Sequence, residues 1–249
     1  MEVQDLCVTI DSNKILKNVS ISFPKNKITC VVGPSGCGKS TLLKCLNRLI
    51  DNTLGAKLSG RIMVDGQDLL KARDSELIDL RRRIGLVPQR PCPLPMSIFD
   101  NVAYGCRIHG MHRGKSELAD VVETYLREVG LWDEVEYRLK EPATRLSGGQ
   151  QQRLCLARSL AVEPDFILAD EATSALDPIS SKIVEDLFVK LKEKYSIIMV
   201  THTLRQALRI ADYAVFLYLG KVIESGDAKE VFRNPQNELT KNYLSGAFS

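Results

Sequence analysis

The chain has 249 residues, 44% hydrophobic and 26% charged, a balance that excludes a disordered or fibrous protein. At this length a single large domain, or two small ones, can fold without disulfide or metal support. The net charge is +3, from 34 basic and 31 acidic residues. The chain therefore lacks the strong excess of positive charge that is typical of nucleic-acid-binding proteins, and we expect no nucleic acid as a partner.

The cysteine pattern and the apolar runs bear on the cellular compartment. Seven cysteines occur, at positions 7, 30, 37, 45, 92, 106 and 155, and no CxxC pair is present. This favours reduced thiols over a zinc site or a disulfide framework. The longest apolar run, 213–219, is far shorter than the ~20 residues of a membrane-spanning helix. With no signal-peptide pattern at the N-terminus, we predict a soluble, intracellular protein.

The first third of the chain predicts strands and one helix. Alternating apolar residues predict strands on both sides of a turn at 11–13. Ile28–Val32 is a continuous apolar run, typical of a strand buried on both faces. From Lys39 to Ile50 the apolar residues follow helical spacing, which predicts one helix. A further strand and a tight turn are expected at 62–66.

The remainder predicts a helical insertion and a parallel sheet. Four prolines between 88 and 95 follow a strand at 84–87 and indicate an extended connector. The region 91–159 is expected to be largely helical. Apolar strands at 166–169 and 197–200 flank a helix whose predicted inner face is Ile183, Val184, Leu187, Phe188 and Leu191. This strand–helix–strand unit implies a parallel sheet covered by helices, closed by a hairpin over 213–224.

A phosphate-binding loop is predicted after the buried strand. The segment matches G-x-x-x-x-G-K-[ST], and its residues are Gly33, Pro34, Ser35, Gly36, Cys37, Gly38, Lys39 and Ser40, followed by Thr41. The glycines let several N–H groups point at one phosphate cluster. Lys39 then reaches the β- and γ-phosphates, and the Ser40 hydroxyl ligates Mg²⁺. A chance match in this composition is expected only about 0.01 times per chain.

Two acidic residues, Asp170 and Glu171, follow the apolar strand at 166–169. Acids beside a buried strand are costly without a counter-charge, and Mg²⁺ supplies one. We therefore predict that Asp170 anchors Mg²⁺ and that Glu171 accepts a proton from the attacking water. Taken alone, the pair would be typical of a solvated turn; the phosphate loop favours the catalytic interpretation.

A second anion site is predicted at Ser147, Gly148, Gly149 and Gln150, which follow Leu146. Ser147 is a natural helix cap, and the two glycines leave N–H groups uncovered at a positive helix end. The two predicted sites are about 110 residues apart. Either both serve one nucleotide, or each contributes half of a site to a different one.

These motifs, in this order and with Ser174-Ala175-Leu176-Asp177 and His202, resemble the nucleotide-binding subunits of ABC transporters over essentially the whole chain. The resemblance implies an α/β P-loop NTPase core (a mostly parallel sheet with flanking helices), an N-terminal antiparallel β region and an inserted α-helical subdomain. It implies one ATPase domain over 1–249, with the core in 1–90 and 160–249 and the helical subdomain in 91–159.

The resemblance also implies ATP and Mg²⁺ as cofactors and a second copy of the chain as partner. Two copies pair head to tail, so that the phosphate loop of one and the LSGGQ segment of the other sandwich ATP. Gln89 matches the lid glutamine that contacts Mg²⁺ and the attacking water. Asp177 matches the aspartate that communicates across the dimer, and His202 the histidine that holds the γ-phosphate together with Lys39.

Two positions depart from the family pattern. Ile10, with Thr9 beside it, stands where an aromatic residue usually stacks on adenine, which predicts weaker discrimination for adenine. Ala172 stands where proline commonly follows the Asp-Glu pair, which predicts a looser turn around Glu171.

Within the family, segments 33–47, 91–110, 131–135 and 146–161 are similar to the ATPase subunit of the high-affinity phosphate importer. This implies a peripheral protein on the cytoplasmic face of the membrane that powers phosphate uptake through two multi-span permease subunits, and serves an extracytoplasmic phosphate-binding protein indirectly. The alternatives are import of another small solute, such as a polar amino acid, and a non-transport ABC ATPase of cofactor assembly.

Overall fold

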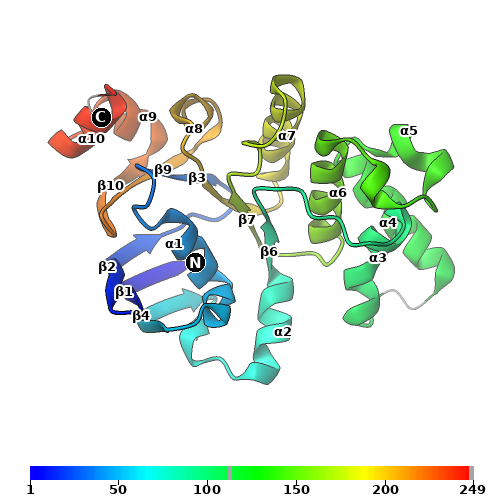
Figure 1. Cartoon of the computed structure of the whole chain (residues 1–249), viewed down its shortest axis with the longest axis horizontal. Coiled ribbons are helices and arrows are strands. Elements are labelled where there is room, and N and C mark those ends of the chain that lie inside the picture. Colours follow the sequence, from blue (N-terminus) through cyan, green and yellow to red (C-terminus); the bar gives the residue numbers. More distant parts are fainter. Residues whose placement is uncertain (112–113, 247–249) are drawn as a thin grey trace.

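Two β-sheets form the framework of the computed structural model, which describes residues 1–111 and 114–246 (Figure 1). Residues 112–113 of the predicted helical subdomain and 247–249 of the predicted core lie outside the described residues. The first sheet has the order β2-β1-β4-β5 and is antiparallel. Its strands are β1 (Glu2–Ile10), β2 (Asn13–Ser22), β4 (Ala56–Val64) and β5 (Gln67–Asp68).

The second sheet has the order β10-β9-β3-β8-β7-β6. Its strands are β3 (Ile28–Val32), β6 (Ile84–Val87), β7 (Phe166–Asp170), β8 (Ser196–Val200), β9 (Tyr213–Tyr218) and β10 (Lys221–Asp227). The strands from β6 to β9 are parallel, and β10 returns antiparallel to β9. The predicted α/β fold, with its mostly parallel sheet and N-terminal antiparallel region, is confirmed.

Ten α-helices occur in the described residues. They are α1 (Lys39–Leu46), α2 (Asp74–Arg83), α3 (Ile98–Ile108), α4 (Lys115–Glu128), α5 (Trp132–Val135), α6 (Gly148–Leu160), α7 (Pro178–Leu191), α8 (Leu204–Ile210), α9 (Ala228–Arg233) and α10 (Glu238–Leu244). Short 3₁₀ turns are Leu49–Asn52, Leu69–Lys71, Glu136–Arg138 and Ala143–Arg145. Helices α3 to α6 lie together at one end of the molecule (Figure 1); the subdomain boundaries at 90 and 160 stay a prediction.

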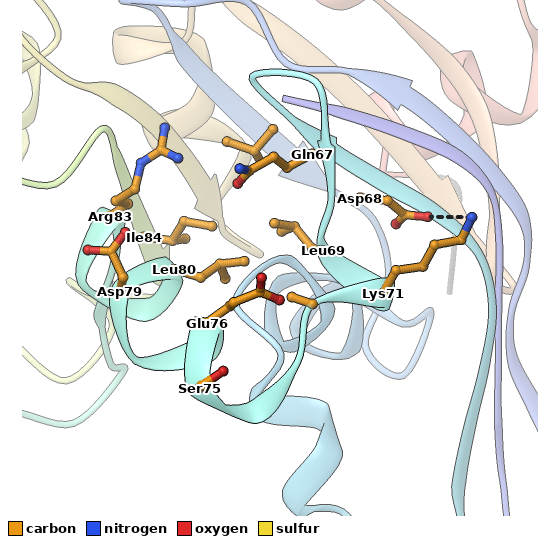
Figure 2. Close-up of a pocket in the computed structure, with 12 residues that line it drawn as sticks. Gln67, Asp68, Leu69, Lys71, Ser75, Glu76, Asp79, Leu80, Arg83 and Ile84 are labelled. Carbon is orange, nitrogen blue, oxygen red and sulfur yellow. Dashed lines mark ion pairs between the residues drawn. The ribbon is translucent and has the colours of Figure 1, made fainter.

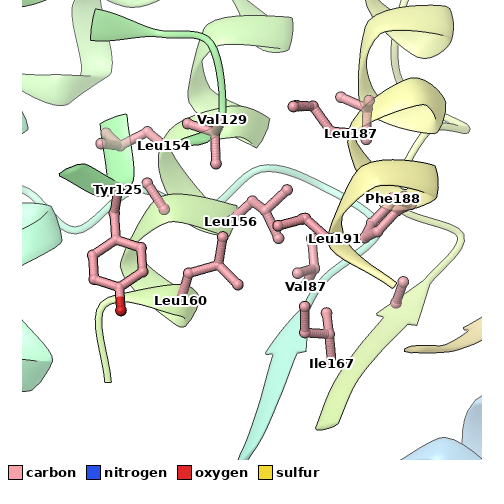
Figure 3. Close-up of a cluster of buried hydrophobic side chains, with 14 of the residues drawn as sticks. Val87, Tyr125, Val129, Leu154, Leu156, Leu160, Ile167, Leu187, Phe188 and Leu191 are labelled. Atoms are coloured by element: carbon pink, nitrogen blue, oxygen red, sulfur yellow. The ribbon is translucent and has the colours of Figure 1, made fainter. Parts of the chain in front are cut away.

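The parallel sheet separates two hydrophobic cores because neighbouring residues of a strand point to opposite faces. On one face, Val31, Leu168 and Ile198 pack with α1 and the antiparallel sheet. On the other, Cys30 and Ile167 pack with helices that include α6 and α7. Figure 3 shows part of this second core, where leucines of α6 and α7 meet Ile167 of β7. Helices α1 and α6 therefore cover opposite faces of the sheet.

Two predictions about helices are wrong in detail. The helix from Lys39 ends at Leu46, not at Ile50, because Arg48 takes up a left-handed conformation (φ 60°) that helical hydrogen bonding does not allow. A separate 3₁₀ turn follows, and Ile50 is still buried within it. Ile183 was predicted on the inner face of α7 but is 41% exposed, because its neighbours Val184 and Leu187 take the inward positions.

Among residues 1–111 and 114–246, no helix has both the length and the apolar character needed to cross a bilayer.

Candidate functional site

The predicted phosphate loop connects β3 to α1 and packs closely against β9 and β2. Gly33 has φ +153°, and a Cβ atom there would collide with the backbone oxygen of Leu217 at the end of β9. Gly38 has φ +108°, and a Cβ atom there would press on Leu16 of β2. Gly38 also occupies the N-cap of α1 without any capping side chain, so the first N–H groups of the helix remain available to an anion.

Lys39 is buried within this loop, with 6% of its surface exposed. Its Nζ atom donates to the backbone oxygens of Gly33 (2.8 Å) and Pro34 (2.9 Å). An ammonium group has three N–H donors and no acceptor, so the cation is held at the loop by two neutral carbonyl groups. A phosphate would offer it a stronger, charged acceptor.

Ser40 and Asp170 come from different strand–helix units and meet beside this loop. The Ser40 hydroxyl donates to Oδ1 of Asp170 (2.9 Å). Burial raises the pKa of Asp170, and the charge of Glu171 acts in the same direction, while the bond from Ser40 opposes both. A half-buried carboxylate beside a hydroxyl is an oxygen-donor pair that suits Mg²⁺, so the residues present fit the predicted cation.

Glu171, Gln89 and His202 converge at the ends of three parallel strands. Oε2 of Glu171 lies 3.0 Å from Nε2 of Gln89 and 3.0 Å from Nδ1 of His202. Gln89 follows β6, Glu171 follows β7 and His202 follows β8. Because these strands are adjacent and parallel, their carboxyl ends share one edge, which is where α/β sheets place ligands.

The turn that carries Glu171 is held by several hydrogen bonds. Its N–H donates to the Val200 oxygen (2.9 Å), and the Ser174 N–H donates back to the Glu171 oxygen (2.9 Å). Nε2 of Gln206, on α8, donates to Oγ1 of Thr173 (2.7 Å). Ala172 is buried within the turn. Tertiary contacts thus restrain the segment in which alanine in place of proline predicted a looser turn.

Sequence reasoning missed the group behind this turn. Glu185 of α7 is buried, accepts hydrogen bonds from Arg209 (2.8, 2.9 and 3.1 Å), and also accepts one from Gln206 (3.2 Å). Gln206 therefore bridges Glu185 and Thr173. The available signal was an acidic residue three positions before the core residue Phe188, on the inner side of an amphipathic helix. These residues line a pocket of about 320 Å³ that also includes His202.

The second predicted anion site lies elsewhere. Ser147 caps α6 by accepting from the Gln150 N–H (3.4 Å), and Gln150 accepts from the Ser147 N–H (2.9 Å), so the predicted cap is confirmed. Nε2 of Gln150 donates to Glu134 (2.7 Å). Because α6 covers the opposite face of the sheet from α1, one chain does not bring Ser147, Gly148, Gly149 and Gln150 to its own phosphate loop.

The remaining predicted residues lie at element ends. Asp177 is exposed and caps α7, accepting from the N–H groups of Ile179 and Ser180 (both 3.0 Å). The hydrogen bonds with Ser180 lower the pKa of Asp177. Ile10 ends β1, half-buried against the core that α1 also joins.

A different hollow, of about 540 Å³, lies between α2 and the β4–β5 hairpin (Figure 2). Gln67, Leu80 and Arg83 are among its lining residues, and Lys71 pairs with Asp68 at its rim. None of the predicted site residues lines it, so we do not assign the candidate site there.

Comparison with known proteins gives one family and several similar structures. The family model described as ABC transporter matches residues 16–174. The structure is similar to cbiO1 from Clostridium perfringens, part of the ABC transporter complex cbiONQ, with a TM-score of 0.81 and 27% identity over 99% of this chain and 95% of that chain.

Two further structures share the fold. The ATP-binding cassette MJ0796, in a dimeric post-hydrolysis state bound to ADP and Pi, has a TM-score of 0.76 and 28% identity over 91% of this chain and 98% of that one. A bacterial Atm1-family ABC exporter with ATP bound has a TM-score of 0.80 and 25% identity, and this chain spans 41% of its length.

Proposed function

The chain belongs to the ABC transporter family, and we propose that it is the ATPase subunit of a phosphate importer, active as a pair of copies. It is an ABC ATPase, so ATP binding and hydrolysis are its chemistry. The observation that carries the catalytic part is the meeting of Gln89, Glu171 and His202 at one sheet edge, next to the Ser40–Asp170 pair. The proposal that the transported solute is phosphate rests on the similarity of four sequence segments, 33–47, 91–110, 131–135 and 146–161, to the ATPase subunit of the phosphate importer.

The phosphate loop binds the nucleotide in this proposal. The open N–H groups at the start of α1 receive the phosphates, and the Lys39 ammonium exchanges its two carbonyl partners for phosphate oxygens. Ser40, Asp170 and Gln89 hold Mg²⁺, which neutralises charge on the β- and γ-phosphates when bound. The Gln89 amide nitrogen is engaged by Glu171 and Ser174, so its oxygen is the atom suited to the cation.

Glu171 acts as the base that orients and deprotonates the attacking water. Its carboxylate is held from two sides by Gln89 and His202, and its backbone by Val200, which fixes the direction in which it accepts a proton. His202 and Lys39 stabilise the negative charge that develops on the transferred phosphoryl group. One chain supplies all of these groups. The second set of N–H donors for the phosphates, at the start of α6, must come from another copy.

The missing donors come from a second copy. Because α1 and α6 cover opposite faces of the sheet, head-to-tail pairing is what brings the Ser147–Gln150 segment of one copy to the phosphate loop of the other. The dimeric state of MJ0796 with ADP and Pi supports this arrangement. Asp177 caps α7 and is exposed. In this proposal it lies at the interface between the two copies and transmits changes from one copy to the other.

We also propose that the pair lies at the cytoplasmic face of the membrane, bound to two multi-span permease subunits. The presence of cbiO1 in a multi-subunit transporter complex supports such an assembly.

The test is uptake of radiolabelled phosphate by cells that carry the wild-type gene, a Glu171→Gln gene or neither. Only the wild type should restore high-affinity uptake. Restored uptake of a polar amino acid instead, or co-purification with soluble partners alone, would contradict the phosphate assignment.

The base-recognition position yields a separate prediction. Ile10 lacks a ring on which adenine could stack, and stacking of a base on an aromatic residue contributes about 1–3 kcal/mol. We expect GTP to be hydrolysed within about tenfold of ATP in kcat/KM, and Ile10→Tyr to raise the preference for ATP. Steady-state hydrolysis of both nucleotides measures this, and a strong ATP preference in the wild type would refute it.

A further inference from the structure

The stretch of chain that carries Gln89 leaves the parallel sheet at the end of β6, next to α6. Val87, the last residue of β6, packs in the same core as Leu156 and Leu160 of α6 (Figure 3). Residues 88–96, which we call the Gln89 segment, form neither helix nor strand, so no helical or sheet hydrogen bonds fix them. The position of Gln89 therefore depends on side chains that bind this segment from outside.

Gln152 of α6 binds the Gln89 segment at its first residue. The side chain lies in a residue that is 1% exposed, and its Nε2 atom donates to the backbone oxygen of Pro88 (3.1 Å). Because proline has no N–H group, this carbonyl oxygen is the only hydrogen-bonding group that Pro88 offers. The same carbonyl belongs to the peptide group that joins Pro88 to Gln89, so the bond fixes the backbone from which Gln89 starts.

An amide side chain at this buried position needs an explanation. The Oε1 atom of Gln152 is buried and has no hydrogen-bond partner among the described residues. A buried polar atom without a partner costs stability, and a methionine of similar volume would avoid that cost. The donor end of the amide is the end that has a partner. The bond to Pro88 therefore explains the glutamine, and packing of the core does not.

Arg158, also on α6, binds the Gln89 segment a second time. Its Nη2 atom donates to the Cys92 oxygen (3.1 Å), and its Nη1 atom donates to Oδ1 of Asn101 (3.3 Å). Asn101 is buried on α3, and the same oxygen accepts from the Leu94 N–H (2.8 Å). The segment is thus attached to α6 and α3 along most of its length.

The side chain of Gln89 points the other way, into the catalytic site. Its Nε2 atom donates to Oε2 of Glu171 (3.0 Å) and to Oγ of Ser174 (3.1 Å). Helix α6 is itself held in place, because its buried Arg153 pairs with Glu134 (2.8 Å). A shift of the Gln89 segment relative to α6 would therefore move the Gln89 amide relative to the Glu171 carboxylate.

We propose that Gln152 is a positioning residue for ATP hydrolysis: its bond to the Pro88 oxygen ties the Gln89 segment to α6 and so sets where the Gln89 amide lies beside Glu171. The catalytic part of this inference rests on the proposed function, in which Gln89 serves the reaction; the effect on the segment does not. Gln152 acts only through Gln89 and does not contact the nucleotide.

Hydrogen–deuterium exchange without nucleotide tests the structural half. Gln152→Met keeps the volume of the side chain and removes its donor. We expect the amides of residues 89–97 to exchange about fivefold faster, the size associated with one uncharged hydrogen bond, and those of β8 to be unchanged. Arg158→Met, at a half-buried position, is a second variant and should act in the same direction. Gln4→Met, at an exposed glutamine of β1, is the matched control and should behave as wild type.

A double-mutant cycle with Gln89→Ala tests the catalytic half. Gln152→Met alone should lower kcat for ATP about fivefold with KM little changed, because the phosphate loop that binds the nucleotide is untouched. In the Gln89→Ala background the same substitution should have no further effect on kcat, because the group that it positions is gone. Steady-state ATP hydrolysis by the four proteins of the cycle measures this.

Equal exchange of residues 89–97 in wild type and both variants would overturn the inference, as would a parallel rise in β8, which would indicate general destabilisation. An unchanged kcat in Gln152→Met, or a loss that persists in the Gln89→Ala background, would overturn it as well. An unchanged kcat in Gln89→Ala alone would contradict the proposed role of Gln89 in the reaction, since the exchange result stands without ATP.

Discussion

Glu171→Gln is expected to lower ATP hydrolysis by about 10²–10⁴-fold, the range for a positioned proton-accepting group, while ATP-dependent dimerisation persists. The substitution is nearly isosteric, and the amide oxygen of glutamine can still accept from Gln89, which lies 3.0 Å from the carboxylate. What is lost is the ability to take a proton from water. ATP turnover and size-exclusion chromatography with and without ATP measure the two halves of this prediction.

The matched control is Glu193→Gln, which neutralises an exposed carboxylate two residues after α7 and should leave turnover unchanged. Hydrolysis near the wild-type rate in Glu171→Gln would remove Glu171 from the role of base. Loss of ATP-dependent dimerisation together with hydrolysis would indicate that the carboxylate is needed to assemble the site, through its contacts with Gln89 and His202.

Lys39→Met should lower kcat/KM for ATP by about 10²–10³-fold, as removal of a preorganised donor from a developing charge does. Methionine fills much of the volume of the buried lysine stem, so the loop should stay packed. The fold loses the bonds from Nζ to the oxygens of Gly33 and Pro34, at a cost of about 1 kcal/mol each. Nucleotide binding and thermal unfolding together distinguish loss of chemistry from loss of structure.

Lys190→Met is the control for this variant, because Lys190 is exposed in the last turn of α7 and contributes only surface charge. We expect its turnover and melting temperature to match those of the wild type. An activity of Lys39→Met within twofold of the wild type would show that the loop binds phosphate through its N–H groups alone.

Motif residues that are close in the chain could be predicted with their local geometry. The phosphate loop has the expected place between a buried strand and a helix, because glycine backbone freedom and helix-start N–H groups are local properties. The Ser147 cap follows for the same reason. The end of the first helix could not be predicted, since the left-handed turn at Arg48 is accompanied by contacts with Asp51 and with Leu69, twenty-one residues away.

The sequence by itself determined which chemical groups this protein possesses: a phosphate loop, an Asp-Glu strand end and a capped glycine-rich helix start. Only the tertiary structure decided which of them meet. The register of parallel strands brings Gln89 and His202, more than one hundred residues apart in the chain, each to 3.0 Å from the Glu171 carboxylate. It leaves the Ser147 helix on the opposite face of the sheet. Likewise, the contact of Gln206 with Thr173 depends on packing between distant elements, because side-chain periodicity fixes the face of an element but not the partner that covers it.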